Sequence, residues 1–473
     1  MHILKLTILN ALLLAIVSSQ SFEDLSQKVQ SFVKISDSEF VINNVRLIDG
    51  TGSLTQDDMS VVVQKGRIVS ISKTNDIKHQ SITKVIDGRG HTLIPGLVML
   101  HEHMFYPSGE GRYNTNQVSF PPLYLAGGAT TIRTGGSVDT YTDLAISRGI
   151  RAGNIPGPDM DVTAPYLEGP GAFLYAMPII STPKEARNHV NFWADLGATS
   201  FKAYNWIDRK SLKSAIRAAH QRGLKVTGHL CSITYREAAD MGIDNLEHGF
   251  YAATDWVLNK KLDECPRGED TRILDIDLNG SEFIELVDHL ISRDVALTST
   301  LAVLERWAPD RKPPPKGAHE SILPQLQERY KENLKRRVES SGEKGTKLLN
   351  RYMAMEKAFY DAGGLLVAGT DPTGAGDVIP GYANQRTVQL LIEMGLSIEE
   401  AVKVCTYNGA LYLERDGEIG TIEQGKRADM ILIKGNPSVD IEAFRQMTIV
   451  FKNGIGYDSQ KLFESVKGWV GVR

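Results

Sequence analysis

The chain has 473 residues, of which 42% are hydrophobic and 23% are charged, and its formal net charge is −4. This length suits one large domain plus a smaller unit, and the composition is ordinary for a soluble globular protein. Without an excess of basic residues, nucleic acid is not expected as a partner.

The first 21 residues have the pattern of a secretory signal peptide. Lys5 precedes an apolar stretch from Leu6 to Val17, and small polar residues follow it. The stretch is shorter than the roughly 20 residues that span a bilayer. We therefore expect a cleaved signal over residues 1–21, a secreted or periplasmic protein and no stable membrane anchor. An uncleaved anchor or a buried helix is the alternative.

Both ends of the remaining chain have β character. Residues 38–93 contain the runs FVINNVRLID and SVVVQKGRIVSIS, separated by turn residues, and residues 414–473 contain ADMILIKG and TIVFKNGIGYD. Short runs of β-branched residues between Gly, Asn and Asp are typical of strands and turns. We expect the two ends to form one composite β-sandwich.

The central region, residues 94–413, alternates apolar strands with helical segments, which predicts an α/β fold with a parallel sheet. Three helical segments end at glycine, over residues 182–197, 208–223 and 233–242, and the first two begin at the N-cap candidates Thr182 and Asp208. Eight strands, the number of a (β/α)8 TIM barrel, are expected at 93–103, 128–134, 159–167, 198–205, 225–230, 244–249, 296–303 and 365–371.

One segment interrupts this alternation, at residues 304–345, with the sequences WAPDRKPPPKGAHE and LPQLQERYKENLKRRVES. Long insertions in compact domains are often functional, and this one follows the seventh strand on the catalytic side of a barrel. It is either a lid or a solvated helical insertion.

The three cysteines are Cys231, Cys265 and Cys405. An odd, small number excludes a framework of several disulfides. One bridge is conceivable, but we expect three isolated, small apolar side chains.

Polar residues stand at the ends of five of the predicted strands. A metal site at the mouth of a barrel requires this placement, because the carboxyl ends of the strands meet there. The residues are His101, His103, Lys202, His229, His248 and Asp371.

The pair His101 and His103 is expected to share one metal. Strand side chains alternate faces, so both imidazoles project to one side and Glu102 to the other. A single His-x-His pair is weak evidence for a metal site. However, unpaired imidazoles in an apolar strand would cost stability, which favours the metal role.

Lys202 is the unusual member of the set. It is either a barrel-end lysine paired with an acid or a deprotonated amine that takes up CO2, giving a carbamate that bridges two cations. Taken singly, His229 and His248 could be packed core histidines as readily as metal ligands. Asp371, which Pro372 follows, could by itself be a turn residue.

Together the six residues form a nitrogen and oxygen set suited to two divalent ions, with Zn²⁺ the expected metal. Two such ions would hold a hydroxide between them and polarise a carbonyl for attack. Asp371 could then take the proton and deliver it to the leaving group.

Two further residues are candidates for binding the substrate. Tyr204 lies two residues after Lys202, on the same strand face, and could donate to a carbonyl or oxyanion, or could simply pack. Arg133 could pair with a substrate carboxylate, or form a structural salt bridge.

The chain resembles the amidohydrolase superfamily, through the sequence VIDGRGHTLIPGLVMLHEH and the two β-rich ends. It is most similar to the binuclear members related to imidazolonepropionase and prolidase-like dipeptidases. The resemblance implies that His101 and His103 bind the more buried metal, that N6-carboxylated Lys202 bridges, that His229 and His248 bind the second metal, and that Asp371 is both ligand and acid/base.

The expected function is therefore cleavage of an amide C–N bond in a small molecule, such as a dipeptide or an N-acyl amino acid. A lactonase, a phosphoesterase or a non-catalytic extracellular binding barrel are the alternatives. The sequence leaves open whether the chain forms a homo-oligomer.

Overall fold

The computed structural model describes residues 20–76, 84–109, 112–172, 177–266, 272–373 and 378–471. The predicted signal peptide falls almost entirely outside these residues. Among the described helices, none combines the length and the apolarity needed to cross a membrane.

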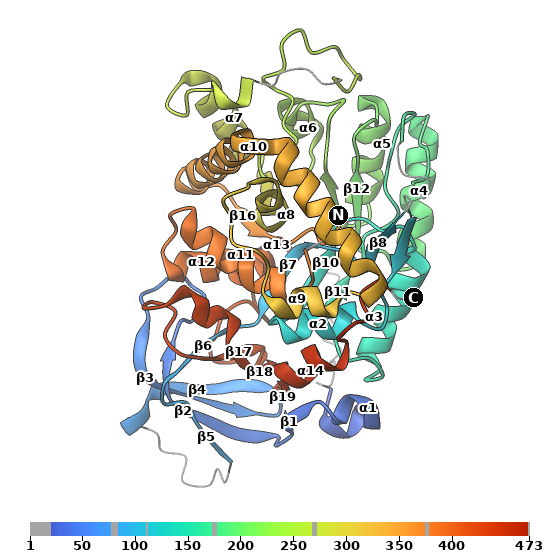
Figure 1. The fold of residues 1–473 in the computed structure, drawn as a ribbon. Coiled ribbons are helices and arrows are strands. Elements are labelled where there is room, and N and C mark those ends of the chain that lie inside the picture. Colours follow the sequence, from blue (N-terminus) through green and yellow to red (C-terminus); the bar gives the residue numbers. More distant parts are fainter. Residues whose placement is uncertain are drawn as a thin grey trace, which may run out of the picture.

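Strands from both ends of the chain lie side by side in one nine-stranded sheet, at the bottom of Figure 1. Their order is β1-β19-β18-β17-β6-β2-β3-β4, and β5 pairs with β2. The strands are β1 (Val33–Ile35), β2 (Glu39–Leu47), β3 (Gln56–Gln64), β4 (Arg67–Lys73), β5 (Val85–Asp87), β6 (His91–Pro95), β17 (Met430–Lys434), β18 (Met447–Lys452) and β19 (Ile455–Asp458).

The sheet is held together by its own apolar core. Phe40 of β2 stacks on Phe451 of β18, with ring centroids 5.2 Å apart. Both rings belong to a cluster that includes Ile42, Val61 and Met430, so the two chain ends bury each other's apolar faces.

The central region contains eight parallel strand segments in the predicted order. They are β7 (Leu97–Glu102), β10 (Ala129–Thr134), β11 (Asp159–Asp161), β12 (Ser200–Ala203), β13 (Lys225–Gly228), β14 (Asn245–Glu247), β15 (Ala296–Ser299) and β16 (Leu366–Ala368). By strand pairing they form a three-stranded sheet, β11-β10-β7, and a five-stranded sheet, β12-β13-β14-β15-β16.

Further contacts connect the two parallel sheets at both sides. Thr163 and Leu167, just after β11, form parallel bridges with Ser200 and Ala203 of β12. On the other side, the backbone N–H of Asp371 donates to the carbonyl of His101 at 3.0 Å. The ends of β16 and β7 are therefore neighbours.

Three predicted strands differ markedly from the observed ones. The third, 159–167, ends at Asp161, and only isolated bridges at Thr163 and Leu167 continue the pairing. The first, 93–103, is divided at Gly96, so that β6 joins the nine-stranded sheet while β7 joins the parallel strands. A Cβ at Gly96 would lie 2.2 Å from the Thr130 hydroxyl oxygen, which explains the glycine. The seventh ends at Ser299, and α8 (Leu301–Leu304) follows it.

Helices pack outside the parallel strands (Figure 1). The predicted caps are present: Thr182 accepts from the Glu185 N–H at 3.2 Å, and Asp208 from Ser211 at 3.0 Å. The helices are α2 (Phe120–Ala126), α3 (Thr140–Arg151), α4 (Pro183–Asp195), α5 (Arg209–His220), α6 (Tyr235–Met241), α7 (Ser281–Ser292), α11 (Tyr382–Glu393), α12 (Ile398–Cys405) and α13 (Tyr407–Tyr412).

The insertion after the seventh strand is mainly helical. It contains α9 (Lys316–Ser321) and the first part of α10 (Pro324–Asp361), which is interrupted at Gly342, where φ is 51°. Figure 1 shows α9 and α10 running across the front of the parallel strands. The insertion is anchored at the C-terminal segment, where Ile322 bridges Val470, and by a hydrogen bond from the Tyr330 hydroxyl to the Pro107 carbonyl.

The cysteines differ from the expectation of three isolated side chains. Cys231 and Cys265 form a disulfide, while Cys405 is buried and free. Their 34-residue separation gave no sequence signal for the pairing, because the loop after β14 brings Cys265 back to Cys231 only in the folded chain.

Glu356 on α10 is a buried carboxyl that should make stability depend on pH. Burial raises its pKa from 4.5 to about 7. The unfolded chain therefore loses this proton at lower pH than the folded chain, so the group destabilises the fold as pH rises from about 4.5 to 7, by about 3 kcal/mol at most.

We predict that Glu356→Gln gains stability relative to the wild type between pH 5 and pH 8, measured by urea denaturation. Glu343→Gln on the same helix, where Glu343 has a side chain 93% exposed, is the control and should show no such trend. A constant difference between Glu356→Gln and wild type at all pH values would contradict the prediction.

Candidate metal centre

The structure brings all six predicted side chains together at the carboxyl ends of the parallel strands. His101 is the second-last residue of β7 and His103 directly follows that strand, Lys202 lies in β12, and His229 directly follows β13. His248 directly follows β14, and Asp371 lies three residues after β16.

Short distances connect the six side chains. One potential ligand atom from each of His101, His248 and Asp371 lies within 4.8 Å of the others. Nε2 of His103 is 3.2 Å from Asp371 Oδ1, and Nζ of Lys202 is 3.0 Å from His101 Nε2. The His229 ring centroid lies 4.6 Å from that of His248.

The first two histidines present their Nε2 atoms to the centre. Nδ1 of His101 lies 2.6 Å from Glu247 Oε2, and Nδ1 of His103 lies 3.1 Å from the Gly136 carbonyl oxygen. An acceptor at Nδ1 fixes the proton there and leaves a lone pair on Nε2. Two lone pairs and the Asp371 carboxylate therefore converge, and this electron-rich arrangement fits a divalent cation.

Burial keeps the histidines in the form that binds metals. It lowers the pKa of His101 to about 4 and that of His229 to about 3, with the nearby Lys202 ammonium acting in the same direction. Burial also lowers the pKa of Lys202 from 10.5 to about 8. Neutral imidazoles and an amine that deprotonates near neutral pH are what a metal centre with a carboxylated lysine requires.

The backbone is unusual at two of the six residues. His248 has φ 65° and Asp371 has φ 49°, in the left-handed region that residues other than glycine rarely adopt. Such conformations cluster at functional sites, because the surrounding fold holds them there. Here they turn two side chains towards the centre just as their strands end.

Glu247 is a functional residue that the sequence analysis missed. Besides His101, it accepts a hydrogen bond from Arg133 Nη2 at 2.6 Å and one from the Thr227 hydroxyl. In a regular strand Glu247 and His248 would point to opposite sides. The left-handed turn at His248 breaks that alternation, so both contact the same group of ligands.

Arg133 is positioned differently from the expectation that it binds a substrate carboxylate. Its side chain is fully buried, Nη2 pairs with Glu247, and Nε donates to the Leu100 carbonyl at 2.7 Å. The geometry therefore matches the alternative, a structural salt bridge, and Arg133 supports His101 through Glu247.

Tyr204 lies beside the candidate metal ligands, as its spacing from Lys202 predicts. Its ring centroid is 4.8 Å from that of His229 and 5.1 Å from that of Tyr166. Phe105 packs against His103 at 4.6 Å, and Tyr251 lies 6.1 Å from His248. Aromatic rings thus surround the centre on several sides.

Glu102 projects away from the two histidines, as strand alternation predicts. It accepts hydrogen bonds from Asn384 at 3.0 Å and from the Thr370 hydroxyl, next to Asp371. Burial raises its pKa to about 8. Glu102 therefore ties β7 to the segment that carries Asp371.

Comparisons with known proteins agree with this geometry. The profile of the Amidohydrolase family matches residues 331–456. An imidazolonepropionase from Caldanaerobacter subterraneus is 34% identical over 91 residues, which are 18% of this chain and 22% of that protein. The matched segment therefore spans about a fifth of that relative.

Two solved structures share the fold over most of their length. A Xaa-Pro dipeptidase with bound methionine in the active site has a TM-score of 0.66 and 21% identity, covering 89% of this chain and 100% of that one. A bottromycin amidohydrolase has a TM-score of 0.68 and 17% identity, covering 94% of each chain. The chain is thus similar to the Amidohydrolase family over residues 331–456, and it shares the fold of these two solved structures.

The contact between Glu247 and His101 yields a prediction on metal affinity. Glu247→Gln keeps the shape of the side chain but removes the charge that holds the Nδ1 proton, so His101 should become a weaker ligand. We expect about 10- to 100-fold weaker binding of Zn²⁺ in competition with a chelator. The control is Glu285→Gln, at an exposed position on α7, and equal affinity of both variants would contradict the role given to Glu247.

Gly369 should also be required for the position of His101. A Cβ there would lie 2.4 Å from His101 Cβ and 2.7 Å from its backbone nitrogen. Gly369→Ala should therefore displace His101, destabilise the fold by about 1–3 kcal/mol and weaken Zn²⁺ binding. Gly417→Ala is a suitable comparison for glycine loss, because no atom lies within 4 Å of a Cβ there and its φ is not positive, and unchanged metal binding in Gly369→Ala would refute the prediction.

Proposed function

We propose that this protein is a metal-dependent hydrolase that cleaves an amide C–N bond of a small molecule. The observation that carries the proposal is the convergence of four histidines, Lys202 and Asp371 at one set of strand ends. The similarity to the Amidohydrolase family over residues 331–456 and to an imidazolonepropionase over 91 residues supports the same reaction class.

We further propose that the eight parallel strands form a closed (β/α)8 barrel. The bridges between the Thr163–Leu167 segment and β12 support closure on one side. The hydrogen bond from Asp371 to the His101 carbonyl supports it on the other. The likeness to solved amidohydrolase structures favours the same architecture.

The donor set is suited to two divalent ions, with Zn²⁺ the proposed metal. His101 and His103 would hold one ion, His229 and His248 the other, and Lys202 and Asp371 would contribute to the centre. Such ions supply Lewis-acid chemistry, polarising a carbonyl and acidifying a water.

Lys202 would serve as a bridge only after modification. Its deprotonated amine adds to CO2, an N–C bond forms and one proton is released, which converts a cationic side chain into a carbamate anion. The lowered pKa of about 8 supports this step, because a substantial fraction of the amine is then neutral near pH 7 to 8.

The chain's own residues would handle the proton and the developing charge. Asp371 would accept a proton from the attacking water and deliver it to the leaving nitrogen. Tyr204 would donate a hydrogen bond from its hydroxyl to the carbonyl oxygen, since burial raises its pKa and keeps the phenol protonated. Glu247 would keep His101 oriented throughout.

The proposed substrates are dipeptides or N-acyl amino acids. The rings of Phe105, Tyr166, Tyr204 and Tyr251 around the centre favour a substrate with apolar groups beside the scissile bond. The structural likeness to a Xaa-Pro dipeptidase is compatible with this class.

We also propose that the protein is exported. The apolar stretch from Leu6 to Val17 is the first argument. The disulfide between Cys231 and Cys265 is the second, because disulfides persist mainly in oxidising compartments.

Amide hydrolysis is tested with zinc-loaded protein on a panel of dipeptides and N-acyl amino acids, with a lactone and a phosphoester of similar size. We expect amide cleavage that falls by about 10²- to 10⁴-fold in Asp371→Asn. Asp361→Asn, at an exposed position on α10, is the control. Cleavage of the lactone or phosphoester alone, or full activity of Asp371→Asn, would refute the proposal.

The carbamate is tested separately, by carbon-13 NMR of protein equilibrated with labelled bicarbonate and Zn²⁺. We expect a carbamate carbonyl signal in the wild type that is missing in Lys202→Met. A spectrum without this signal in the wild type would contradict carboxylation while leaving amide hydrolysis open to test.

A further inference from the structure

An apolar cavity of about 270 Å³ lies between the loop after β14 and the helices after β15. Its apolar lining comes from Tyr251, Leu304, Trp307, Leu348, Leu349 and Tyr352. Trp307 ends the short helix η4 (Glu305–Trp307), and the last three of these residues belong to α10. At about 30 Å³ per water, the volume corresponds to roughly nine waters, which is enough space for a phenyl or indole group.

Two of the aromatic rings in this lining are open to solvent. Tyr251 is 45% exposed and Trp307 is 43% exposed. An isolated exposed ring is common on protein surfaces, but these two line one cavity together with the buried Leu304 and Leu349. A ligand in the cavity would therefore cover accessible apolar surface, and the removal of that surface from water would favour binding.

Tyr251 connects the cavity with the proposed metal ligands. Its ring centroid lies 5.7 Å from that of Tyr352 in the cavity wall, 6.1 Å from that of His248 and 6.2 Å from that of His229. One aromatic ring thus separates the cavity from two of the proposed ligands. A side group a few bonds away from a scissile amide at the metal centre would span this separation.

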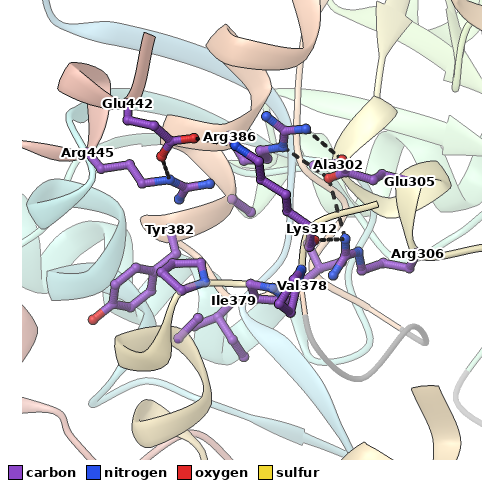
Figure 2. Close-up of a pocket in the computed structure, with 15 residues that line it drawn as sticks. Ala302, Glu305, Arg306, Lys312, Val378, Ile379, Tyr382, Arg386, Glu442 and Arg445 are labelled. Carbon is purple, nitrogen blue, oxygen red and sulfur yellow. Dashed lines mark hydrogen bonds and ion pairs between the residues drawn. The ribbon is translucent and has the colours of Figure 1, made fainter. Parts of the chain in front are cut away.

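The Trp307 side of the cavity is held in place by the surrounding fold. A Cβ at Gly345 would lie 2.0 Å from the Trp307 carbonyl oxygen, so α10 packs directly against the backbone of η4. The Arg337 guanidinium lies over the Trp307 ring, 4.9 Å from its centroid. Glu305, two residues before Trp307, accepts a hydrogen bond from Arg386 Nη2 at 2.7 Å, and Figure 2 shows this contact. The wall is therefore formed before a ligand binds, which lowers the cost of binding.

The polar part of the lining disfavours a cationic ligand. It consists of Ser340, Ser341, Lys344 and Gly345. Lys344 is thus the one charged residue in the described lining, and a cation placed there would lack a carboxylate partner. An aromatic ligand would gain further from edge-to-face or stacked contacts with Trp307 and the two tyrosines. An uncharged aromatic group therefore fits the cavity better than a cationic or a very small one.

We propose that this cavity is a specificity pocket for the substrate and binds an uncharged aromatic group next to the scissile amide. The inference rests on the amide hydrolysis proposed above, and it narrows the substrates to N-acyl amino acids or dipeptides that carry such a group. Trp307 and Tyr251 contact the ring of the substrate. The insertion after β15 thus supplies one wall of the pocket.

The first test compares amides that differ only by a phenyl ring: N-acetylphenylalanine with N-acetylalanine, and N-phenylacetylglycine with N-acetylglycine. The ring lies on the amine side of the scissile bond in the first pair and on the acyl side in the second. With zinc-loaded protein, we expect kcat/KM to be about tenfold higher or more for the ring-bearing amide of at least one pair. Hydrolysis without such a preference in either pair would overturn the proposal.

Binding is measured in parallel, so that the result does not depend on turnover. Each amide is replaced by a ketone in which a methylene group stands for the amide nitrogen, and calorimetric titration of the zinc-loaded wild type gives the Kd. We expect the ring-bearing ketone of at least one pair to bind about tenfold more tightly or better. A preference without cleavage of any amide would support the pocket and refute the hydrolysis, whereas equal binding in both pairs would overturn the pocket.

Two variants locate the bound ring. Trp307→Ala removes one wall and Ser341→Phe fills the cavity, so each should reduce the preference for the ring-bearing ketone by about tenfold and leave the Kd of the small ketones unchanged. Trp469→Ala is the matched control, because Trp469 is 46% exposed and lies outside the lining, and it should keep the wild-type preference. A wild-type preference in both Trp307→Ala and Ser341→Phe would place the ring elsewhere and overturn the proposal.

Discussion

The structure depends on a convergence of electron-rich groups that protein side chains alone do not neutralise. The Nε2 lone pairs of His101 and His103 face the Asp371 carboxylate, with His229 and His248 alongside. Lys202 brings a positive charge into this space, and burial lowers its pKa. Bound cations would relieve the repulsion between these groups.

The surrounding fold maintains this convergence. Glu247, Arg133 and Thr227 form a buried network behind His101, while Glu102 and Asn384 connect β7 to the segment carrying Asp371. Glycines stand where any side chain would push His101 aside, at positions 135 and 369. The left-handed backbone at His248 and Asp371 is sustained by the same packing. Buried hydrogen bonds, glycines and left-handed backbone thus hold the geometry of one site.

Much of this arrangement could be predicted from the sequence, because strand ends in parallel α/β folds meet at one edge. That rule alone located the six side chains and the order of the strands. It could not orient a side chain whose strand departs from regular alternation, so Glu247 was missed. Nor could it show that Arg133 turns inward to an acid from another strand, or that Cys265 returns to Cys231. These depend on contacts between distant segments, which local patterns do not encode.

We propose that Lys202, as a carbamate, would be shared by two metal ions among the four histidines and Asp371. It is tested most directly by a crystal structure of the protein grown with Zn²⁺ and bicarbonate, with anomalous differences measured at the zinc edge. We expect two zinc peaks, with continuous density extending from Lys202 Nζ to both. A single peak, or density at Lys202 that ends at the amine, would contradict it.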